Sequence, residues 1–179
     1  MNNDLEILYN ILTQNDVVLS IKENIDELVR IIPEVRTMFN FDQKNPHHHL
    51  DVWEHTLLAL SFSDPDFEIR LILLLHDIGK PLTAFDDESG VRHFWGHPYA
   101  SGFIAEKIFN RLNIPNDLKS EMLEIIERHD DKMSPIYIKI NKERALKLFE
   151  VQRCDSLAHD PKKVESRIKY LNHIKSLFI

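Results

Sequence analysis

The chain has 179 residues and a formal net charge of −7, with 43% hydrophobic and 28% charged residues. This length favours one domain over two, and the balance is typical of a globular protein with a sizeable core. The small number of glycines, 4, argues against Gly-rich phosphate loops, and the acidic charge argues against an extended nucleic-acid surface, because phosphate contacts need clustered lysine and arginine.

Apolar residues recur at helical spacing along nearly the whole chain, which predicts an all-α fold. Helices are expected over these ranges: 5–12, 25–32, 51–62, 67–78, 98–112, 116–130, 141–158 and 161–177. Asp64 is the expected N-cap of the 67–78 helix, with Pro65 in its first turn. That helix is apolar on several faces, as expected of a central buried helix.

Irregular segments separate these helices. Thr83 to Gly96 is the least regular stretch, and residues 86–90 are expected to form an exposed loop tip. Ile136 to Ile140 has a β-like pattern and is predicted to be a loop. No internal repeat or linker interrupts the chain, so residues 1–179 are predicted to form a single domain.

Three further features predict a cytoplasmic protein that does not cross a membrane. The single cysteine, Cys154, excludes an internal disulfide and fits a reducing compartment. The N-terminal residues MNNDLEILYN lack the basic start and apolar run of a signal peptide. The longest near-continuous apolar run, Ile69 to Leu75, is interrupted by Arg70 and is too short to span a bilayer.

Several histidines and aspartates interrupt helical stripes that should be buried. His55, His129 and Asp155 each share a face with apolar residues of their own helix, while His76 and Asp77 end the most apolar helix. A buried carboxylate must be paired, protonated or bound to metal. One histidine alone would indicate a hydrogen-bonded core residue, but several helix ends directing imidazole and carboxylate inward indicate a divalent metal site. A lone cysteine excludes a Cys-rich zinc site.

These residues resemble a known family. His55, then His76-Asp77 in the run LLHDIGK, then Asp155 in RCDSLAH, is similar to the H…HD…D signature of HD-domain phosphohydrolases. The segment FWGHPYASGFIAEKIFNRLNIP, followed by His129-Asp130, extends the resemblance to the HD domain of bacterial tRNA nucleotidyltransferases and to small stand-alone HD hydrolases. The resemblance covers about residues 48–160, the motif-bearing core on which N- and C-terminal helices are expected to pack. Its specificity lies in the order of the elements, because an HD dipeptide alone is uninformative.

The resemblance implies an HD-domain helical bundle that uses one or two divalent metal ions (Mn, Fe, Mg, Co, Ni or Zn). Its first metal would be bound by four side chains: His55, His76, Asp77 and Asp155. In family members with a second metal, Asp77 bridges the two ions, and the positions of His97 and His129 complete the second site. This chain has Asp130 after His129, where the most histidine-rich members have a second histidine.

Asp77 and Lys80 are the candidate catalytic residues. A bound divalent ion would lower the pKa of water, and two ions sharing Asp77 would also neutralise charge on a phosphoryl oxygen. Lys80 lies one helical turn after His76 and, by family resemblance, reaches the substrate phosphate. The structural alternative for Lys80 is a cation at a helix C-terminus.

Other candidate substrate-binding residues lie on the irregular stretch. Arg92 and His93 are expected to bind phosphate or to protonate a leaving group, with a solvated loop as the alternative. Trp53 and Trp95 are expected to pack in the core, with stacking on a base as the alternative.

Taken together, the residues and the resemblance predict a metal-dependent phosphohydrolase that cleaves a phosphomonoester or phosphodiester of a nucleotide or related small molecule. A single-metal nucleotidase and a two-metal phosphodiesterase or phosphatase both fit. The alternative is a non-catalytic module that senses a nucleotide or metal or binds a partner protein; a purely structural bundle would not need so many inward histidines and aspartates. The expected partner is a small phosphate ester, without a membrane or extended nucleic acid, and a homo-oligomer is compatible with the sequence.

Overall fold

The computed structural model describes residues 3–45, 49–162 and 164–178, and these confirm the all-α prediction. Their elements are α1 (Asn3–Leu12), α2 (Val17–Glu23), α3 (Ile25–Ile31), the 3-10 helix η1 (Pro33–Met38), α4 (Val52–Ser61), α5 (Phe67–Leu75), α6 (Lys80–Thr83), β1 (Phe85–Asp86), β2 (Arg92–His93), α7 (His97–Leu112), α8 (Asn116–Arg128), α9 (Pro135–Ile140), α10 (Lys142–Leu157) and α11 (Glu165–Ser176). No helix within these described ranges is long and apolar enough to cross a membrane.

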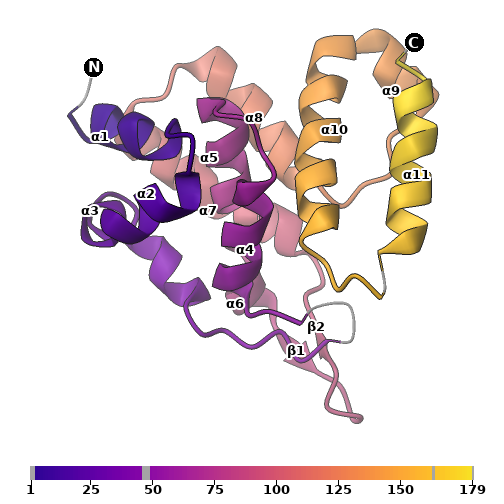
Figure 1. Ribbon diagram of the computed structural model, residues 1–179, viewed down its shortest axis with the longest axis horizontal. Helices are drawn as coiled ribbons and strands as arrows, with labels where there is room; N and C mark the ends of the chain where they lie inside the picture. The colour runs from indigo at the N-terminus through magenta and orange to yellow at the C-terminus, as the bar shows by residue number, and fades with distance from the viewer. Residues whose placement is uncertain (1–2, 46–48, 163, 179) are drawn as a thin grey trace.

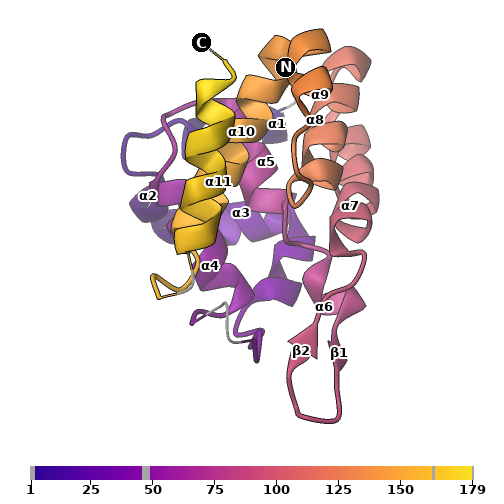
Figure 2. The same cartoon turned by 90° about the vertical axis from the view of Figure 1, so that its right-hand side faces the viewer.

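The helices form a bundle around α5. In Figure 1, α4 and α5 lie between the N-terminal helices α1 to α3 and the C-terminal pair α10 and α11. Figure 2 shows α7 and α8 side by side, with the β1–β2 hairpin projecting from one end of the molecule. Helix α5 contacts α1, α4, α8 and α10. The segment that follows α5 is therefore surrounded by other helices.

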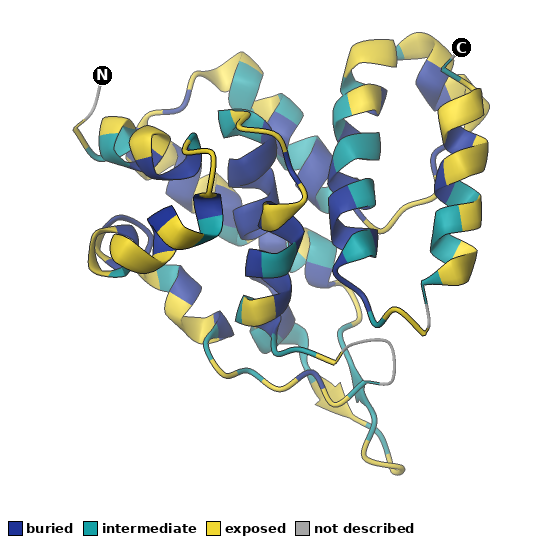
Figure 3. Cartoon of the chain, viewed as in Figure 1, coloured by how far each residue is buried: buried dark blue, intermediate teal, exposed yellow. Residues whose placement is uncertain are grey.

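Burial follows this arrangement, as Figure 3 shows. Every residue of α5 from Ile69 to Leu75 is buried, because helices pack against it on several sides. The α5 stretch of the predicted 67–78 helix is thus confirmed as central and buried. Residues 76–79, which follow as turns, are buried as well, so polar side chains in this segment must find partners inside the protein.

The polar residue in the middle of this apolar helix, Arg70, is 1% exposed. Its guanidinium donates to the carbonyls of Leu12 and Gln14 at 2.6 Å each and to the carbonyl and hydroxyl of Ser63 at 3.0 and 3.1 Å. Arg70 therefore joins the end of α1 to the turn before α5 and satisfies backbone groups that water does not reach.

Replacing Arg70 with methionine should lower the free energy of unfolding by about 2–4 kcal/mol, because the buried carbonyls lose their donors. Equilibrium unfolding in urea measures the change. Arg30→Met is the matched control, since Arg30 is exposed and pairs only with surface acids, Asp4 and Glu27. Equal losses in the two variants would contradict the structural role assigned to Arg70.

The structure corrects two local predictions. Helix α5 is capped by Asp66 rather than Asp64, because the Asp66 side chain accepts a hydrogen bond from the backbone N–H of Ile69 at 2.9 Å. The predicted loop at residues 136–140 is helix α9, whose first turn is capped by the Ser134 hydroxyl. Each cap satisfies a free N–H of the first helical turn.

Several short features were not predicted: helix α2, the 3-10 helix η1, helix α6 and the β1–β2 hairpin. Helix α2 (Val17–Glu23) begins at an Asp16 cap, where the side chain accepts from the Leu19 N–H. Within the irregular stretch, Phe85 pairs with His93 and Asp86 with Arg92 in a two-stranded antiparallel hairpin. The hairpin brings β2 to the end of the bundle where α6 and α7 begin.

Candidate metal centre

The structure brings all six expected ligand residues together at the centre of the bundle. They are 0–7% exposed, and each comes from or near a helix terminus or first turn: His55 (α4), His76 and Asp77 (after α5), His97 (α7), His129 (the C-cap of α8) and Asp155 (α10).

The first group contains the four residues that the resemblance assigns to one ion. His55 Nε2 lies 2.9 Å from Asp155 Oδ1 and 3.6 Å from Asp77 Oδ2. His76 Nε2 lies 3.3 Å from Asp77 Oδ2 and 3.7 Å from Asp155 Oδ1. Two imidazole nitrogens and two carboxylates therefore face one point.

The second group lies on the other side of Asp77. Asp77 Oδ1 is 3.2 Å from His97 Nε2 and 3.7 Å from His129 Nε2, and these two nitrogens are 3.1 Å apart. Asp130 Oδ2 lies 3.5 Å from His97 Nε2, so a carboxylate adjoins this group. The Asp77 carboxylate thus directs one oxygen to each group, which is the geometry a bridging ligand requires.

The backbone fixes the orientation of all four histidines. The Nδ1 atoms lie within hydrogen-bond distance of backbone carbonyl oxygens, in these pairs: His55 with Ala158, His76 with Leu73, His97 with Phe94 and His129 with Ile126. A carbonyl only accepts, so Nδ1 carries the proton and donates. Each Nε2 atom is thereby directed into the cluster, which is how metal-binding histidines are held.

Glycine at position 79 allows the two groups to meet. A Cβ atom there would lie 2.5 Å from the backbone nitrogen of Ser101 and 2.7 Å from the carbonyl oxygen of His97. The Gly79 N–H donates to the Ser101 hydroxyl at 2.9 Å. This close approach holds the first turn of α7, and with it His97, against the segment that carries Asp77.

The residues present fit a divalent cation. His76 Nε2 and both oxygens of Asp77 are buried and lack a hydrogen-bond partner within the described part of the chain. Buried polar atoms without hydrogen bonds favour the binding of positive charge, and the Lys80 ammonium already contacts one of the two Asp77 oxygens. Three sets of potential ligand atoms each lie within 4.8 Å of one another: His55, His76 and Asp77; Asp77, His97 and His129; and His55, Asp155 and His159. Imidazole with carboxylate suits Zn, Mn, Fe and similar ions.

Charges inside the cluster outweigh the effect of burial. Burial raises the pKa of Asp77, but the charges of His76 and Lys80 hold that pKa well below 3.8. Burial lowers the pKa of His76, but Asp77 and Asp155 raise it to about 10. The ionised carboxylates therefore attract positive charge to the His76 imidazole, and a divalent ion bound there would displace its proton.

Lys80 lies inside this centre, and its side chain is buried. Its Nζ is 2.7 Å from Asp77 Oδ2 and donates to Gln43 Oε1 at 2.9 Å. Lys80 begins the short helix α6 rather than ending a helix, so the dipole alternative does not apply. It lines a cavity of about 400 Å³ beside the cluster.

Arg92 and His93, the two candidate substrate-binding residues on the hairpin, differ in whether they line the cavity. The guanidinium of Arg92 binds Asp86 on the paired strand and the carbonyl of Asp42, and Arg92 is not among the residues that line the cavity. His93 does line the cavity, with its Nε2 2.7 Å from Asp87 Oδ2.

The two tryptophans also differ. Trp53 packs against Phe39 with ring centroids 4.7 Å apart, as expected of a partly buried residue. Trp95 is 73% exposed at the rim of the cavity, so the expectation of core packing is wrong for it. Its indole stacks on the His93 ring at 5.3 Å and 26°. Trp95 follows strand β2 of the hairpin that projects from one end of the molecule, away from the helical core (Figure 2).

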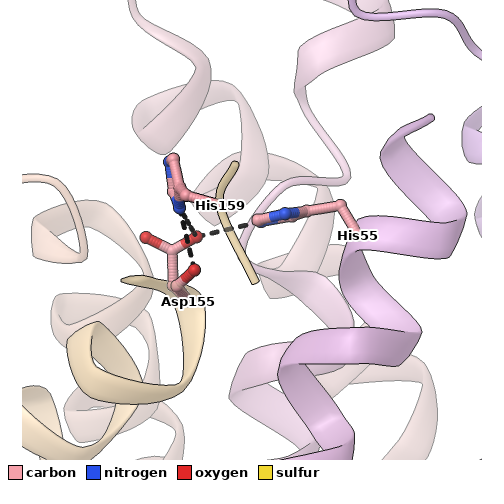
Figure 4. Close-up of side chains that lie close together, drawn as sticks. All are labelled: His55, Asp155 and His159. Carbon is pink, nitrogen blue, oxygen red and sulfur yellow. Dashed lines mark hydrogen bonds and ion pairs between the residues drawn. The ribbon is translucent and has the colours of Figure 1, made fainter. Parts of the chain in front are cut away.

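Two residues of the centre, His159 and Arg167, were not identified from the sequence. Figure 4 shows His159 and His55 both directed at Asp155, with His159 Nδ1 3.5 Å from Asp155 Oδ1. His159 Nε2 accepts a hydrogen bond from Arg167 at 2.6 Å. Burial lowers the pKa of His159 to about 4, with Arg167 adding to the effect against the opposing charge of Asp155. His159 follows Asp155 by one helical turn, a spacing that could have indicated it.

Several known proteins are similar to this chain. The model of the HD domain family matches residues 47–169. The CC-adding tRNA nucleotidyltransferase of Thermus thermophilus is 32% identical over 145 residues, which is 78% of this chain and 32% of that protein. The A-adding tRNA nucleotidyltransferase of Deinococcus radiodurans is 35% identical over 104 residues, or 55% of this chain and 24% of that protein. The multifunctional CCA protein of Teredinibacter turnerae is 31% identical over 112 residues, which is 57% of this chain and 25% of that protein. The matched part spans about a third or less of these relatives.

Proposed function

This chain belongs to the HD domain family, and on that premise we propose that it is a metal-dependent phosphohydrolase that cleaves a phosphate ester of a nucleotide or related small molecule. The observation that carries this proposal is the buried Asp77 carboxylate, which contacts Lys80 and directs one oxygen at each of two groups of histidine Nε2 atoms.

Two groups of residues in this chain would bind the metal ions. His55, His76, Asp77 and Asp155 would hold the first ion. Asp77, His97 and His129 would hold a second, with the Asp130 carboxylate close to them. A divalent ion in such a site acts as a Lewis acid that activates water and neutralises charge on phosphoryl oxygens.

The walls of the cavity suit the rest of the substrate. Lys80 and Arg167 place two cations beside the cluster, where they can bind phosphate oxygens. The cavity, at about 400 Å³, lies in the usual size range of small-molecule sites. The exposed indole of Trp95 at its rim offers a surface on which a nucleobase can stack. The nucleotide addition in the relatives' names belongs to proteins of which this chain matches about a third or less.

Metal analysis and hydrolysis assays on the same preparation test the proposal. Purified protein should contain one or two equivalents of divalent metal and should hydrolyse an aryl phosphate or a bis-aryl phosphodiester. Activity should disappear after chelation and return when Mn, Fe, Co, Ni, Zn or Mg is added. A protein that binds metal but hydrolyses neither ester faster than its chelated form would instead be a sensor or interaction module.

A further inference from the structure

A second cavity adjoins the metal centre. It has a volume of about 270 Å³ and lies between the end of α8, helix α10 and helix α11. His129, Asp130 and Arg167 line this cavity and also the larger cavity that contains Lys80 and Trp95. The two cavities therefore meet at a common wall, and a candidate ligand of the second metal is part of that wall.

Arg167 lies at the junction of the two cavities. Its guanidinium contacts His159 Nε2 at 2.6 Å, Asp130 Oδ1 at 3.3 Å and Asp155 Oδ2 at 3.4 Å, and its side chain remains 34% exposed. The Asp130 and Asp155 carboxylates hold this cation at the junction, and its exposed part remains open to an anionic ligand. The planar guanidinium suits paired oxygens of a phosphate.

The smaller cavity has the chemistry of a neutral, hydroxyl-bearing ligand. Gln152 and Ser156 line it and are 4% and 3% exposed, and Gln152 Oε1 is buried without a hydrogen-bond partner among the described residues, so it is available to accept from a ligand hydroxyl. Tyr170 and Leu171 supply an apolar wall. The charged wall residues balance, with two acids and two bases: Asp130, Asp131, Lys132 and Arg167. A sugar, with an apolar ring face and hydroxyl groups, matches these features better than a second phosphate does.

We propose that this cavity is a second substrate subsite and that the substrate is a phosphodiester held at Arg167, with one ester substituent in each cavity. The inference rests on the proposed hydrolase function. A phosphomonoester has one organic substituent, and the larger cavity alone accommodates it. In the reaction, one water forms a new P–O bond while one P–O ester bond breaks. The products are a monoester and an alcohol, and the alcohol oxygen gains a proton from the water.

Three coloured esters with the same leaving group test the subsite. They are para-nitrophenyl phosphate, methyl para-nitrophenyl phosphate and the para-nitrophenyl diester of thymidine monophosphate. Ser166→Trp would fill the mouth of the smaller cavity, because Ser166 is an exposed wall residue on α11. The ratio of kcat/KM for the thymidine diester to that for the monoester should fall about tenfold or more. The ratio of kcat/KM for the methyl diester to that for the monoester should change little, because a methyl group does not need the smaller cavity.

A matched variant and a binding measurement complete the design. Ser176→Trp places the same side chain at the exposed end of the same helix and should leave both ratios at the wild-type value. Ser156→Val should raise KM for the thymidine diester severalfold through loss of one hydrogen bond. Equilibrium binding of the thymidine diester to metal-free protein should weaken in both cavity variants and not in Ser176→Trp.

The outcomes separate the two proposals. Hydrolysis of all three esters with ratios that Ser166→Trp leaves unchanged would overturn the subsite and leave the hydrolase function standing. A protein that hydrolyses no ester, but loses thymidine diester binding in both cavity variants, would overturn the hydrolase function and support the subsite.

Discussion

Replacing Asp77 with alanine is expected to abolish hydrolysis and to remove most of the bound metal. Asp77 Oδ2 lies 3.3 Å from His76 Nε2, and Oδ1 lies 3.2 Å from His97 Nε2, so one substitution removes a ligand from both groups. The same change removes the partner that holds Lys80 in the centre. We expect kcat to fall by at least on the order of a thousandfold.

Elemental analysis and turnover, measured on one preparation, check this expectation. Asp26→Ala is the control for loss of an aspartate, because Asp26 is exposed on α3, remote from the cluster. Circular dichroism should show both variants folded and helix-rich, since an alanine at 77 removes a buried charge rather than an apolar contact. A wild-type metal content in Asp77→Ala would refute the assignment of Asp77 as a shared ligand.

The second large effect concerns the other side of the cluster. Replacing both His97 and His129 with alanine should lower the metal-to-protein ratio from two to one and reduce kcat by orders of magnitude. The two Nε2 atoms are 3.1 Å apart and both face Asp77 Oδ1, whereas the first group meets at Asp77 Oδ2 and Asp155 Oδ1. Loss of both should therefore spare the first group, and the remaining ion should stay bound.

His173→Ala controls for removal of a histidine, because His173 is exposed near the end of α11. The ratio should be measured under metal-replete conditions for all variants. A wild-type ratio near one that does not change in the double variant would exclude a second metal site. Any loss of activity would then come from substrate positioning or proton transfer by the two histidines.

Periodicity predicted most of the helices, but capping decided the local exceptions. The alternating pattern at residues 136–140 indicates neither helix nor buried strand, and it forms α9 because Ser134 caps it and Pro135 fixes its first turn. Tyr137 and Ile138 are buried while Ile136 and Ile140 are exposed. Tertiary packing thus selected one face of a segment whose own pattern was ambiguous.

Five of the six predicted ligands were recognisable because each interrupts an apolar stripe or ends an apolar helix, whereas His97 was expected only from the family resemblance. Arg167 has no such signal. It lies on a solvent-facing helix with other charged residues, and only the packing of α11 against α10 brings it to Asp155. Arg92 shows the reverse case, because its place in the sequence near His97 indicated the site while its partner Asp86 holds it away. Sequence periodicity does not reveal which charged side chains will pair in the folded protein.

The contact between His55 and Asp155 joins residues 100 positions apart, whereas His97 and His129 are 32 apart on two helices that pack as neighbours. The entropy of loop closure makes the longer connection slower to form. We therefore expect the His97–His129 pair to assemble early, in a local helical hairpin, and the first group to be completed only when α4 docks on α10. An ion that needs both groups would then bind after the rate-limiting step. It would prolong the lifetime of the folded chain by slowing its unfolding, without hastening its folding.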